Sequence, residues 1–320
     1  ITRFLLERGD DVILYNRGQT PLRAEGAQAH AKREYPAVHA FEAQIAALGH
    51  FDCVIDMVCF TPAQAESVVR ACAGRTTQFI FCSTVDVYSR PAPRYPYRED
   101  APREAISDYG RNKVACEDVF LAAHARGDFA ATIIRPAMTY GEGGAIVHTF
   151  GWSTTYLDRM RKGRPIVVHG DGQSLWVTCH VDDVARAFVA AIGNERAYGK
   201  AYHTAGDHWM TWNQFHAGVA EALGVPLPRL VHIPSDVLAA IAPERAGITI
   251  FNFQYDTIFD NSAAKADLGF AQTIDWVEGV RRTVAWLDAN RPIENSDADR
   301  YEDRLIEAWD RMVRGLPVDG

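Results

Sequence analysis

The sequence lacks the features that mark membrane, secreted or metal-binding proteins. No apolar run approaches the roughly 20 residues of a membrane-spanning helix, and Arg3, Glu7 and Arg8 argue against a secretory signal peptide. The six cysteines form no Cys-x-x-Cys pair and no Cys/His spacing typical of a metal site. We therefore expect reduced and mostly buried thiols, no bound metal, no membrane partner and a cytoplasmic location.

Basic residues are outnumbered by acidic ones, which argues against a nucleic-acid partner. Lys and Arg together number 33 against 41 Asp and Glu, so the net charge is −8 and the isoelectric point is about 5.8. A protein that tracks a phosphate backbone needs a clustered basic face instead. The hydrophobic content of 48% suffices for a large core and one or two domains. We therefore expect a small-molecule substrate.

Strand-like and helix-like segments alternate through the first half of the chain. Apolar strands separated by helices indicate βαβ units and a parallel sheet covered on both faces. The sequence thus predicts an α/β, doubly wound parallel-sheet Rossmann fold. The expected strands are 11–15, 51–58, 77–84 and 130–136, and the expected helices are 40–49, 61–74 and 107–127.

The second half is less regular and predicts a small C-terminal substrate lobe. We expect residues 1–165 to form the dinucleotide-binding domain, and 166–320 to combine a returning strand and helix with this lobe. The charged tail predicts a docked surface helix with Leu305, Trp309 and Met312 on one stripe. The other expected elements are strands at 166–172 and 200–206, and helices at 180–194, 211–224 and 276–290.

Four residues predict a catalytic centre. Tyr109 and Lys113 lie four apart on an expected helix, so their side chains share one face. An expected buried strand ends in Ser83 and Thr84, and carboxyl ends of strands line the ligand crevice of open α/β sheets. Lys113 would lower the pKa of the Tyr109 phenol from about 10 toward the range useful for proton transfer, and Thr84 would position the substrate oxygen. The alternative is a solvated Tyr/Lys pair, as on many helices.

Five segments in one order resemble the extended and atypical short-chain dehydrogenase/reductase family, which includes NAD-dependent epimerases and dehydratases. They are CSTVDVYS, YGRNK, IIRPAMTYGEG, GDGQSLWVTCHVDDVARAF and FDNSAAKADLGF, and together they span almost the whole chain. The resemblance implies that Thr84 is the catalytic hydroxyl with Ser83 beside it, and that Tyr109 is the acid/base. It also implies that Lys113 holds the nicotinamide ribose.

The opening stretch ITRFLLERGDDVILYNRG resembles the family's first Rossmann helix, entered partway, and the following strand. Ile1, Phe4 and Leu5 with Gly9 predict the end of an amphipathic helix. Family members place a strand and a Gly-x-x-Gly-x-x-Gly turn before this helix to bind the cofactor pyrophosphate. No segment here has that spacing, so we expect an N-terminally truncated chain with weakened cofactor affinity and activity.

The end of the second family strand bears on cofactor choice. An acidic residue there grips the adenosine ribose of NAD, whereas Asn16 and Arg17 stand here, and Arg17 would pair with a 2′-phosphate. We therefore expect NADP to be favoured over NAD. The alternative is that Arg17 is simply exposed beyond the strand. The expected cofactor contacts are Asn16, Arg17, Asp56, Met57, Val58, Ser83, Tyr109, Lys113, Pro136 and Ala137.

Two departures from the family pattern concern the substrate. Met138 stands where sugar-nucleotide enzymes often have Asn, and Trp176 stands near the place of an Arg that holds the diphosphate. No Lys or Arg lies in 173–185, which argues against a nucleotide-diphosphate sugar. Met138, Trp176 and His180 are the expected substrate contacts. The alternative for His180 is a structural role at a strand end, and Asp183 is expected to cap the following helix.

The combined interpretation is an NAD(P)-dependent oxidoreductase or epimerase that transfers hydride at a carbinol or ketone carbon. The substrate would be a sugar-like or small carbonyl compound. The absence of the dehydratase acidic pair, with Val85-Asp86 after Thr84, makes a dehydratase unfavoured. A non-catalytic NAD(P)- or RNA-binding protein on the same fold is the alternative. The resemblance also implies a homodimer through the helices around Tyr109.

Overall fold

Alternate side chains of the central strands bury opposite faces of a parallel sheet. In this computed structural model, which describes residues 1–16, 28–32 and 38–315, Phe79 and Phe81 join one hydrophobic cluster and Ile80 joins another. The four strands pair in the order β10-β5-β4-β3, all parallel. They are β3 (Phe51–Asp56), β4 (Thr76–Cys82), β5 (Ala130–Pro136) and β10 (Lys200–Thr204).

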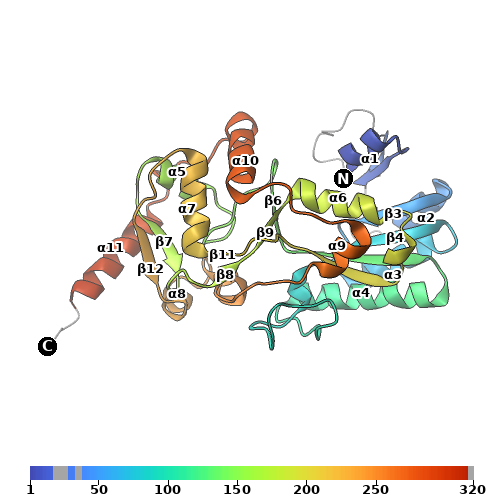
Figure 1. Cartoon of the computed structure of the whole chain (residues 1–320), viewed down its shortest axis with the longest axis horizontal. Coiled ribbons are helices and arrows are strands. Elements are labelled where there is room, and N and C mark those ends of the chain that lie inside the picture. The colour runs from blue at the N-terminus through green and yellow to red at the C-terminus, as the bar shows by residue number, and fades with distance from the viewer. Residues whose placement is uncertain (17–27, 33–37, 316–320) are drawn as a thin grey trace.

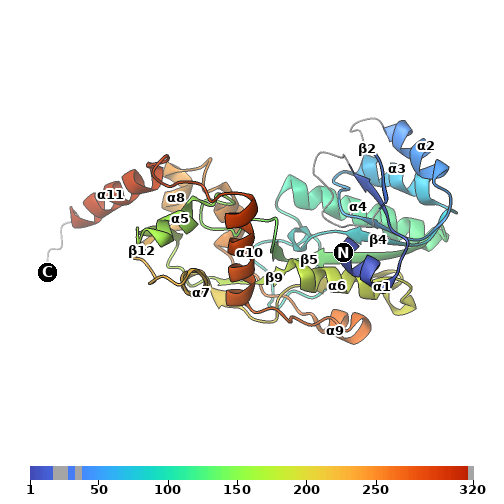
Figure 2. The same ribbon diagram turned by 90° about the horizontal axis from the view of Figure 1, so that it is seen from above.

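Helices cover both faces of this sheet, as the doubly wound prediction requires (Figures 1 and 2). The cluster on one face joins Phe79 and Phe81 to Phe120 of α4, and the cluster on the other joins Ile80 to Phe188 of α6. The helices on the first face are α3 (Pro62–Cys72) and α4 (Asp108–Arg126), and those on the second are α6 (Val181–Ala191) and α9 (Ser262–Leu268). The expected fold class is therefore confirmed.

The N-terminal segment forms a separate pair of parallel strands. Gly9 ends the first helix with φ 91°, as the sequence predicted, and its amide donates to Leu6 O. The strand at 28–32 was not predicted. Arg17 lies outside the described residues. The elements are α1 (Thr2–Arg8), β1 (Ile13–Asn16), β2 (Gln28–Lys32) and α2 (Val38–Ala47), with β1 paired to β2.

The second lobe has its own aromatic core, in which Trp176, Trp212 and Phe253 pack together with ring centroids 4.9–5.0 Å apart. Figure 1 shows this lobe beside the sheet along the long axis of the molecule. Its elements are α5 (Thr155–Arg161), β7 (Ile166–His169), β8 (Leu175–Trp176), β11 (Met210–Thr211), α7 (Trp212–Leu223), β12 (Leu230–Ile233), α8 (Ser235–Ile241), the π-helix η3 (Thr249–Phe253), α10 (Trp276–Asn290) and α11 (Tyr301–Arg314).

The chain passes between the two lobes several times. It leaves the sheet after β5, enters the lobe core at Tyr140 and Ile146, and returns to the sheet at β10. Two short strands, β6 (Met138–Tyr140) and β9 (Thr178–His180), pair in parallel between the lobes. Residues 146–160 share one hydrophobic cluster with Ile166, and the division of the chain at residue 165 stays a prediction.

Two expected helix details differ in the structure. The side chain of His180, rather than that of Asp183, caps α6 by accepting from Asp182 N at 3.2 Å. Asp183 is fully buried and instead accepts hydrogen bonds from the amides of Thr273 and Ile274. These bonds anchor the segment before α10. The tail helix docks only by its first half.

The first half of the tail helix α11 packs on the second lobe, whereas its second half is exposed. Leu305 and Ile306 are buried, but Met312 is 49% exposed, so the expected stripe packs on the lobe only at its start. No helix among the described residues is long and apolar enough to cross a membrane.

Packing of α7 on α10 depends on a residue without a side chain. A Cβ at Gly218 would lie 2.5 Å from Trp276 Cδ1, whereas a Cβ at Gly247 would meet nothing within 4 Å. We predict that Gly218→Ala lowers the free energy of unfolding by about 1–3 kcal/mol, since the indole must move. Gly247→Ala, the matched control, should be neutral or slightly stabilising. Urea unfolding measures both, and equal effects would contradict this packing.

Candidate active site

Lys113 is buried beneath the N-terminal end of α4 and is held by two main-chain carbonyls. Its Nζ donates to Cys59 O at 2.9 Å and to Cys82 O at 2.8 Å. Cys82 ends β4, and Cys59 follows β3, so one ammonium joins the helix to the carboxyl ends of two neighbouring strands. The side chain of Tyr109, one turn earlier on α4, remains 43% exposed at the same edge.

Thr84 and Tyr109 meet at this edge. Thr84 is extended, and its Oγ1 accepts from Asp86 N at 3.1 Å at the start of the short 3₁₀ helix η1 (Val85–Val87). The Thr84 hydroxyl also lies close enough to the Tyr109 phenol to act on the pKa of that phenol, which it lowers. Gly110 permits this approach, because a Cβ there would lie 2.2 Å from Asp86 O. The structure therefore brings the three predicted catalytic residues together.

The electrostatics of Tyr109 differ from the sequence expectation. Burial, followed by the negative charge of Asp86, raises the pKa of Tyr109 to about 12, although the Thr84 hydrogen bond opposes this. Lys113 Nζ lies 5.9 Å from the Tyr109 ring centroid and donates its hydrogen bonds to two main-chain carbonyls. Burial lowers the pKa of Lys113. The predicted lowering of the tyrosine pKa by Lys113 is thus not found in the protein alone.

Ser83, an expected cofactor contact, faces the interior instead. Its hydroxyl donates to Glu117 Oε1 at 2.5 Å. Arg135 makes two further bonds to this carboxylate, at 2.9 and 2.7 Å, and also donates to Tyr88 OH. Ser83 is 4% exposed, so it fixes strand β4 against α4.

Apolar surface lines the carboxyl edge beside Lys113. Met57 and Val58 are 43% and 40% exposed, and Asp56 accepts from Val58 N at 2.9 Å, which shapes the turn after β3. Phe60, which was not predicted from the sequence, is 44% exposed, and its ring centroid lies 4.9 Å from Lys113 Nζ. Exposed apolar side chains therefore surround the buried ammonium of Lys113 at this edge.

The remaining expected cofactor residues lie at strand ends. Asn16 ends β1, and Pro136 ends β5 with the buried Ala137 following it. Arg17 lies outside the described residues, so its predicted contact stays a prediction.

The expected substrate residues are mostly interior. Met138 packs against the lobe core, and Trp176 is 3% exposed within that core. His180 is fully buried, with its Nε2 3.2 Å from Glu142 Oε2, and burial lowers its pKa. Trp176 and His180 therefore present almost no surface to a ligand in this structure.

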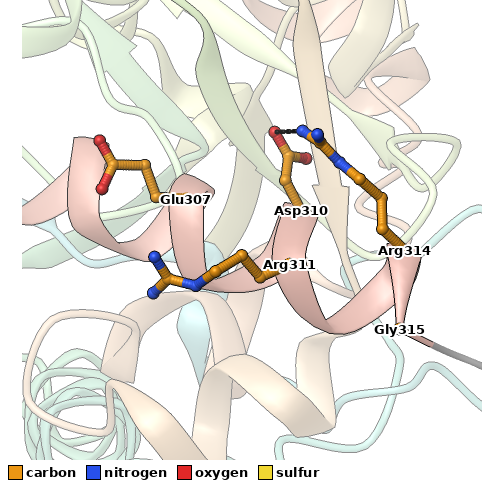
Figure 3. A pocket seen from close by; sticks show the side chains of 5 residues that line it. All are labelled: Glu307, Asp310, Arg311, Arg314 and Gly315. Atoms are coloured by element: carbon orange, nitrogen blue, oxygen red, sulfur yellow. Dashed lines mark ion pairs between the residues drawn. The ribbon is translucent and has the colours of Figure 1, made fainter.

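A surface hollow lies far from this edge, along α11 (Figure 3). Asp310 there pairs with Arg229 at 2.8 Å and lies 4.0 Å from Arg314. Because its lining is charged and exposed at the opposite end of the molecule from α4, the hollow offers none of the catalytic groups. It is lined by Glu307, Asp310, Arg311, Arg314 and Gly315.

Comparisons with known proteins agree with this geometry. The model of the NAD dependent epimerase/dehydratase family matches residues 63–204. A 2'-dehydrokanamycin reductase from Streptomyces kanamyceticus is 30% identical over 81% of this chain and 72% of its own. The chloroplast stem-loop binding protein of 41 kDa b from Arabidopsis thaliana is 27% identical over 96% and 80%. The UDP-glucose 4-epimerase structure from Thermotoga maritima superposes with TM-score 0.69 at 20% identity, covering 90% of this chain and 94% of that one.

Titration of Tyr109 tests the electrostatics. At pH 10, where an ordinary tyrosine is about half ionised, Tyr109 should remain protonated, because its pKa is raised to about 12. The ultraviolet difference between the wild-type protein and Tyr109→Phe, measured without cofactor, isolates this phenol. Asp86→Asn should lower the pKa, since it removes a negative charge. A midpoint below 10 in the wild-type protein would contradict the assignment.

Proposed function

Since the chain belongs to the NAD-dependent epimerase/dehydratase family, we propose that Thr84, Tyr109 and Lys113 catalyse hydride transfer at a carbinol or ketone carbon. The substrate is a sugar-like or small carbonyl compound. The observation that carries the proposal is the position of Tyr109, whose ring centroid lies 5.9 Å from the fixed ammonium of Lys113 at the sheet edge that also carries Thr84.

The proton chemistry follows from the protonation state of Tyr109. Bound nicotinamide supplies or accepts the hydride. A neutral phenol, favoured by the raised pKa, donates its proton to the carbonyl oxygen during reduction. Thr84 donates a hydrogen bond to the same oxygen and orients the carbonyl. In the oxidative direction the phenol must first lose its proton and then accepts the proton of the carbinol hydroxyl.

Lys113 acts by position. An ammonium has three N–H donors, and the carbonyls of Cys59 and Cys82 take two of them. The third serves a cofactor ribose hydroxyl, as the family resemblance implies.

Reduction of a ketone is the favoured outcome. The relative that is 30% identical over most of the chain is named as a reductase of 2'-dehydrokanamycin, a ketone by that name. Epimerisation would use the same residues in two successive transfers. The absence of Lys and Arg from 173–185 argues against a diphosphate clamp there.

RNA binding is the second candidate, because one relative is named as a stem-loop binding protein. The net charge of −8 disfavours it, since phosphate neutralisation requires basic side chains. A stem-loop RNA titrated at several salt concentrations decides the matter: salt-dependent binding would support this candidate.

Tyr109→Phe tests the catalytic role. We predict a loss of about 10²–10⁴-fold in kcat/KM for ketone reduction by the full-length protein, because the proton donor is removed. Tyr198→Phe, a half-buried tyrosine beyond η2 (Glu195–Ala197), is the matched control and should retain activity. Nicotinamide absorbance reports the rate. Undiminished turnover by Tyr109→Phe would refute the mechanism.

Arg17 tests the preference for NADP. We predict that Arg17→Glu weakens NADPH binding about tenfold or more relative to NADH, because a carboxylate repels the 2′-phosphate and favours the ribose hydroxyls. Nicotinamide fluorescence gives both dissociation constants. An unchanged NADPH/NADH ratio would show that Arg17 does not contact the phosphate.

A further inference from the structure

Two cysteine thiols are in contact directly behind the candidate active site. Cys59 lies between β3 and α3, and Cys116 lies on α4, one turn after Lys113. The Cys59 thiol donates to Cys116 Sγ, and the two sulfur atoms are 3.9 Å apart. Both residues are fully buried, and both are free cysteines in this structure. Because a disulfide places its sulfur atoms about 2 Å apart, the two sulfurs would approach each other by about 2 Å to form one.

The hydrogen bond between the thiols gives them different protonation properties. The hydrogen bond from Cys59, together with the positive charge of Lys113, lowers the pKa of Cys116. The same hydrogen bond, together with burial, raises the pKa of Cys59. Since the thiolate is the nucleophile in thiol oxidation, Cys116 is the sulfur that attacks an oxidant. Cys59 is then the sulfur that completes the disulfide.

The two cysteines belong to segments that differ in how firmly they are held. Glu117, the residue after Cys116, accepts a hydrogen bond from Ser83 and two from a buried arginine, so this part of α4 is fixed on the sheet. Cys59 lies instead between the exposed side chains of Val58 and Phe60. A disulfide would therefore displace the segment that carries Cys59 and leave α4 in place.

Displacement of this segment acts directly on Lys113. The main-chain carbonyl of Cys59 accepts from Lys113 Nζ at 2.9 Å, and it is one of the two carbonyls that hold the ammonium. The Phe60 ring centroid lies 4.9 Å from the same nitrogen. Movement of the Cys59 main chain would thus disturb one hydrogen bond to the ammonium and the apolar surface beside it.

We propose that Cys59 and Cys116 form a site of reversible disulfide formation, with a peroxide as the oxidant, and that the disulfide weakens dinucleotide binding at Lys113. This inference rests on the proposed function, since the site is taken to bind a nicotinamide dinucleotide. Reduced protein is the active form, and oxidised protein regains its affinity when a thiol reductant opens the disulfide.

One molecule of hydrogen peroxide balances the reaction. Cys116, after releasing its proton, attacks one peroxide oxygen; the O–O bond breaks, and the departing hydroxide takes up that proton to become water. Cys59 then attacks the resulting sulfenic sulfur, its own proton passes to the leaving hydroxyl, and a second water departs as the S–S bond forms. The two thiols lose two electrons in total, and the peroxide gains them.

A small oxidant reaches the pair through the segment that carries Cys59. The side chains on both sides of this residue are exposed, so a local opening of 57–60 suffices to admit a molecule as small as hydrogen peroxide. A dinucleotide bound beside Lys113 covers this segment. Bound NADPH is therefore expected to slow the oxidation.

Hydrogen peroxide treatment of the full-length protein tests the proposal. After alkylation of the remaining thiols, mass spectrometry should find peptides that link Cys59 to Cys116, and their formation should be slower with saturating NADPH. Nicotinamide fluorescence should show an NADPH dissociation constant raised about tenfold or more, since a hydrogen bond to the ammonium is disturbed. Dithiothreitol should restore the affinity, because it reduces a disulfide but not a sulfinic acid. Linked peptides without a change in affinity, or no linked peptides, would overturn the proposal.

Variants locate the effect. Cys116→Ala, compared with its own reduced form, should form no linked peptides and show no comparable change in NADPH affinity after peroxide treatment. Cys179→Ala is the matched control, because Cys179 is equally buried but packs on the opposite face of the sheet. It should respond to peroxide as the wild-type protein does. Where circular dichroism shows that Cys116→Ala does not fold, Cys59→Ala replaces it. A loss of affinity that persists in the folded variant would overturn the proposal.

The outcomes separate this inference from the proposed function. Retained turnover in Tyr109→Phe defeats the proposed function. The same variant should still form the disulfide and lose NADPH affinity, because neither thiol depends on the phenol, and this result supports the inference whatever the turnover. Where neither the reduced nor the oxidised wild-type protein binds NADPH, the inference is overturned.

Discussion

The buried ammonium of Lys113 is the interaction on which the arrangement of the site depends. Charge-assisted hydrogen bonds to the carbonyls of Cys59 and Cys82 replace the water that the ammonium loses on burial. Because those carbonyls follow two adjacent strands, the bonds set both the height and the rotation of α4 over the sheet edge. Tyr109 is then presented at a fixed place without a hydrogen bond from Lys113 itself.

The same face of α4 continues the connection one turn further. Glu117 lies four residues after Lys113 and receives the Ser83 hydroxyl and two bonds from the buried Arg135. Breaking such a buried ion pair typically costs about 3–5 kcal/mol. Strands β4 and β5 are therefore tied to the helix directly behind Thr84 and Pro136. These bonds hold α4 rigidly on the sheet, and Tyr109 lies at the exposed N-terminal end of this helix.

Periodicity and spacing predicted the sheet, both helical layers and the meeting of Thr84, Tyr109 and Lys113, because local patterns decide these features. Thr61 and Thr211 begin their helices with capping boxes, in which each threonine side chain and a glutamine three residues later bond to main-chain amides. The roles of Ser83 and Trp176 were not predictable, because burial depends on partners such as Glu117 and Trp212 from distant segments. The hydrogen bond from Asn252 to Asp86 was not predictable either, because it joins η3 to a segment 166 residues away.

The direction of the shift in the Tyr109 pKa was also not predictable, because it too depends on residues from distant segments. The sequence places Lys113 near Tyr109. The carbonyls that bind the Lys113 ammonium, and the Asp86 carboxylate that acts on Tyr109, are brought there only by the tertiary structure.

The repeated passage of the chain between the lobes has a consequence for modularity. Since β10 returns to the sheet after the lobe core has begun, no single cut yields an autonomous half. Exchange of the whole lobe between relatives would require several coordinated grafts. A point substitution in η3, by contrast, changes the lobe at a single position. Divergence of such a protein toward new compounds is thus expected to proceed by substitution within the lobe and not by recombination of whole domains.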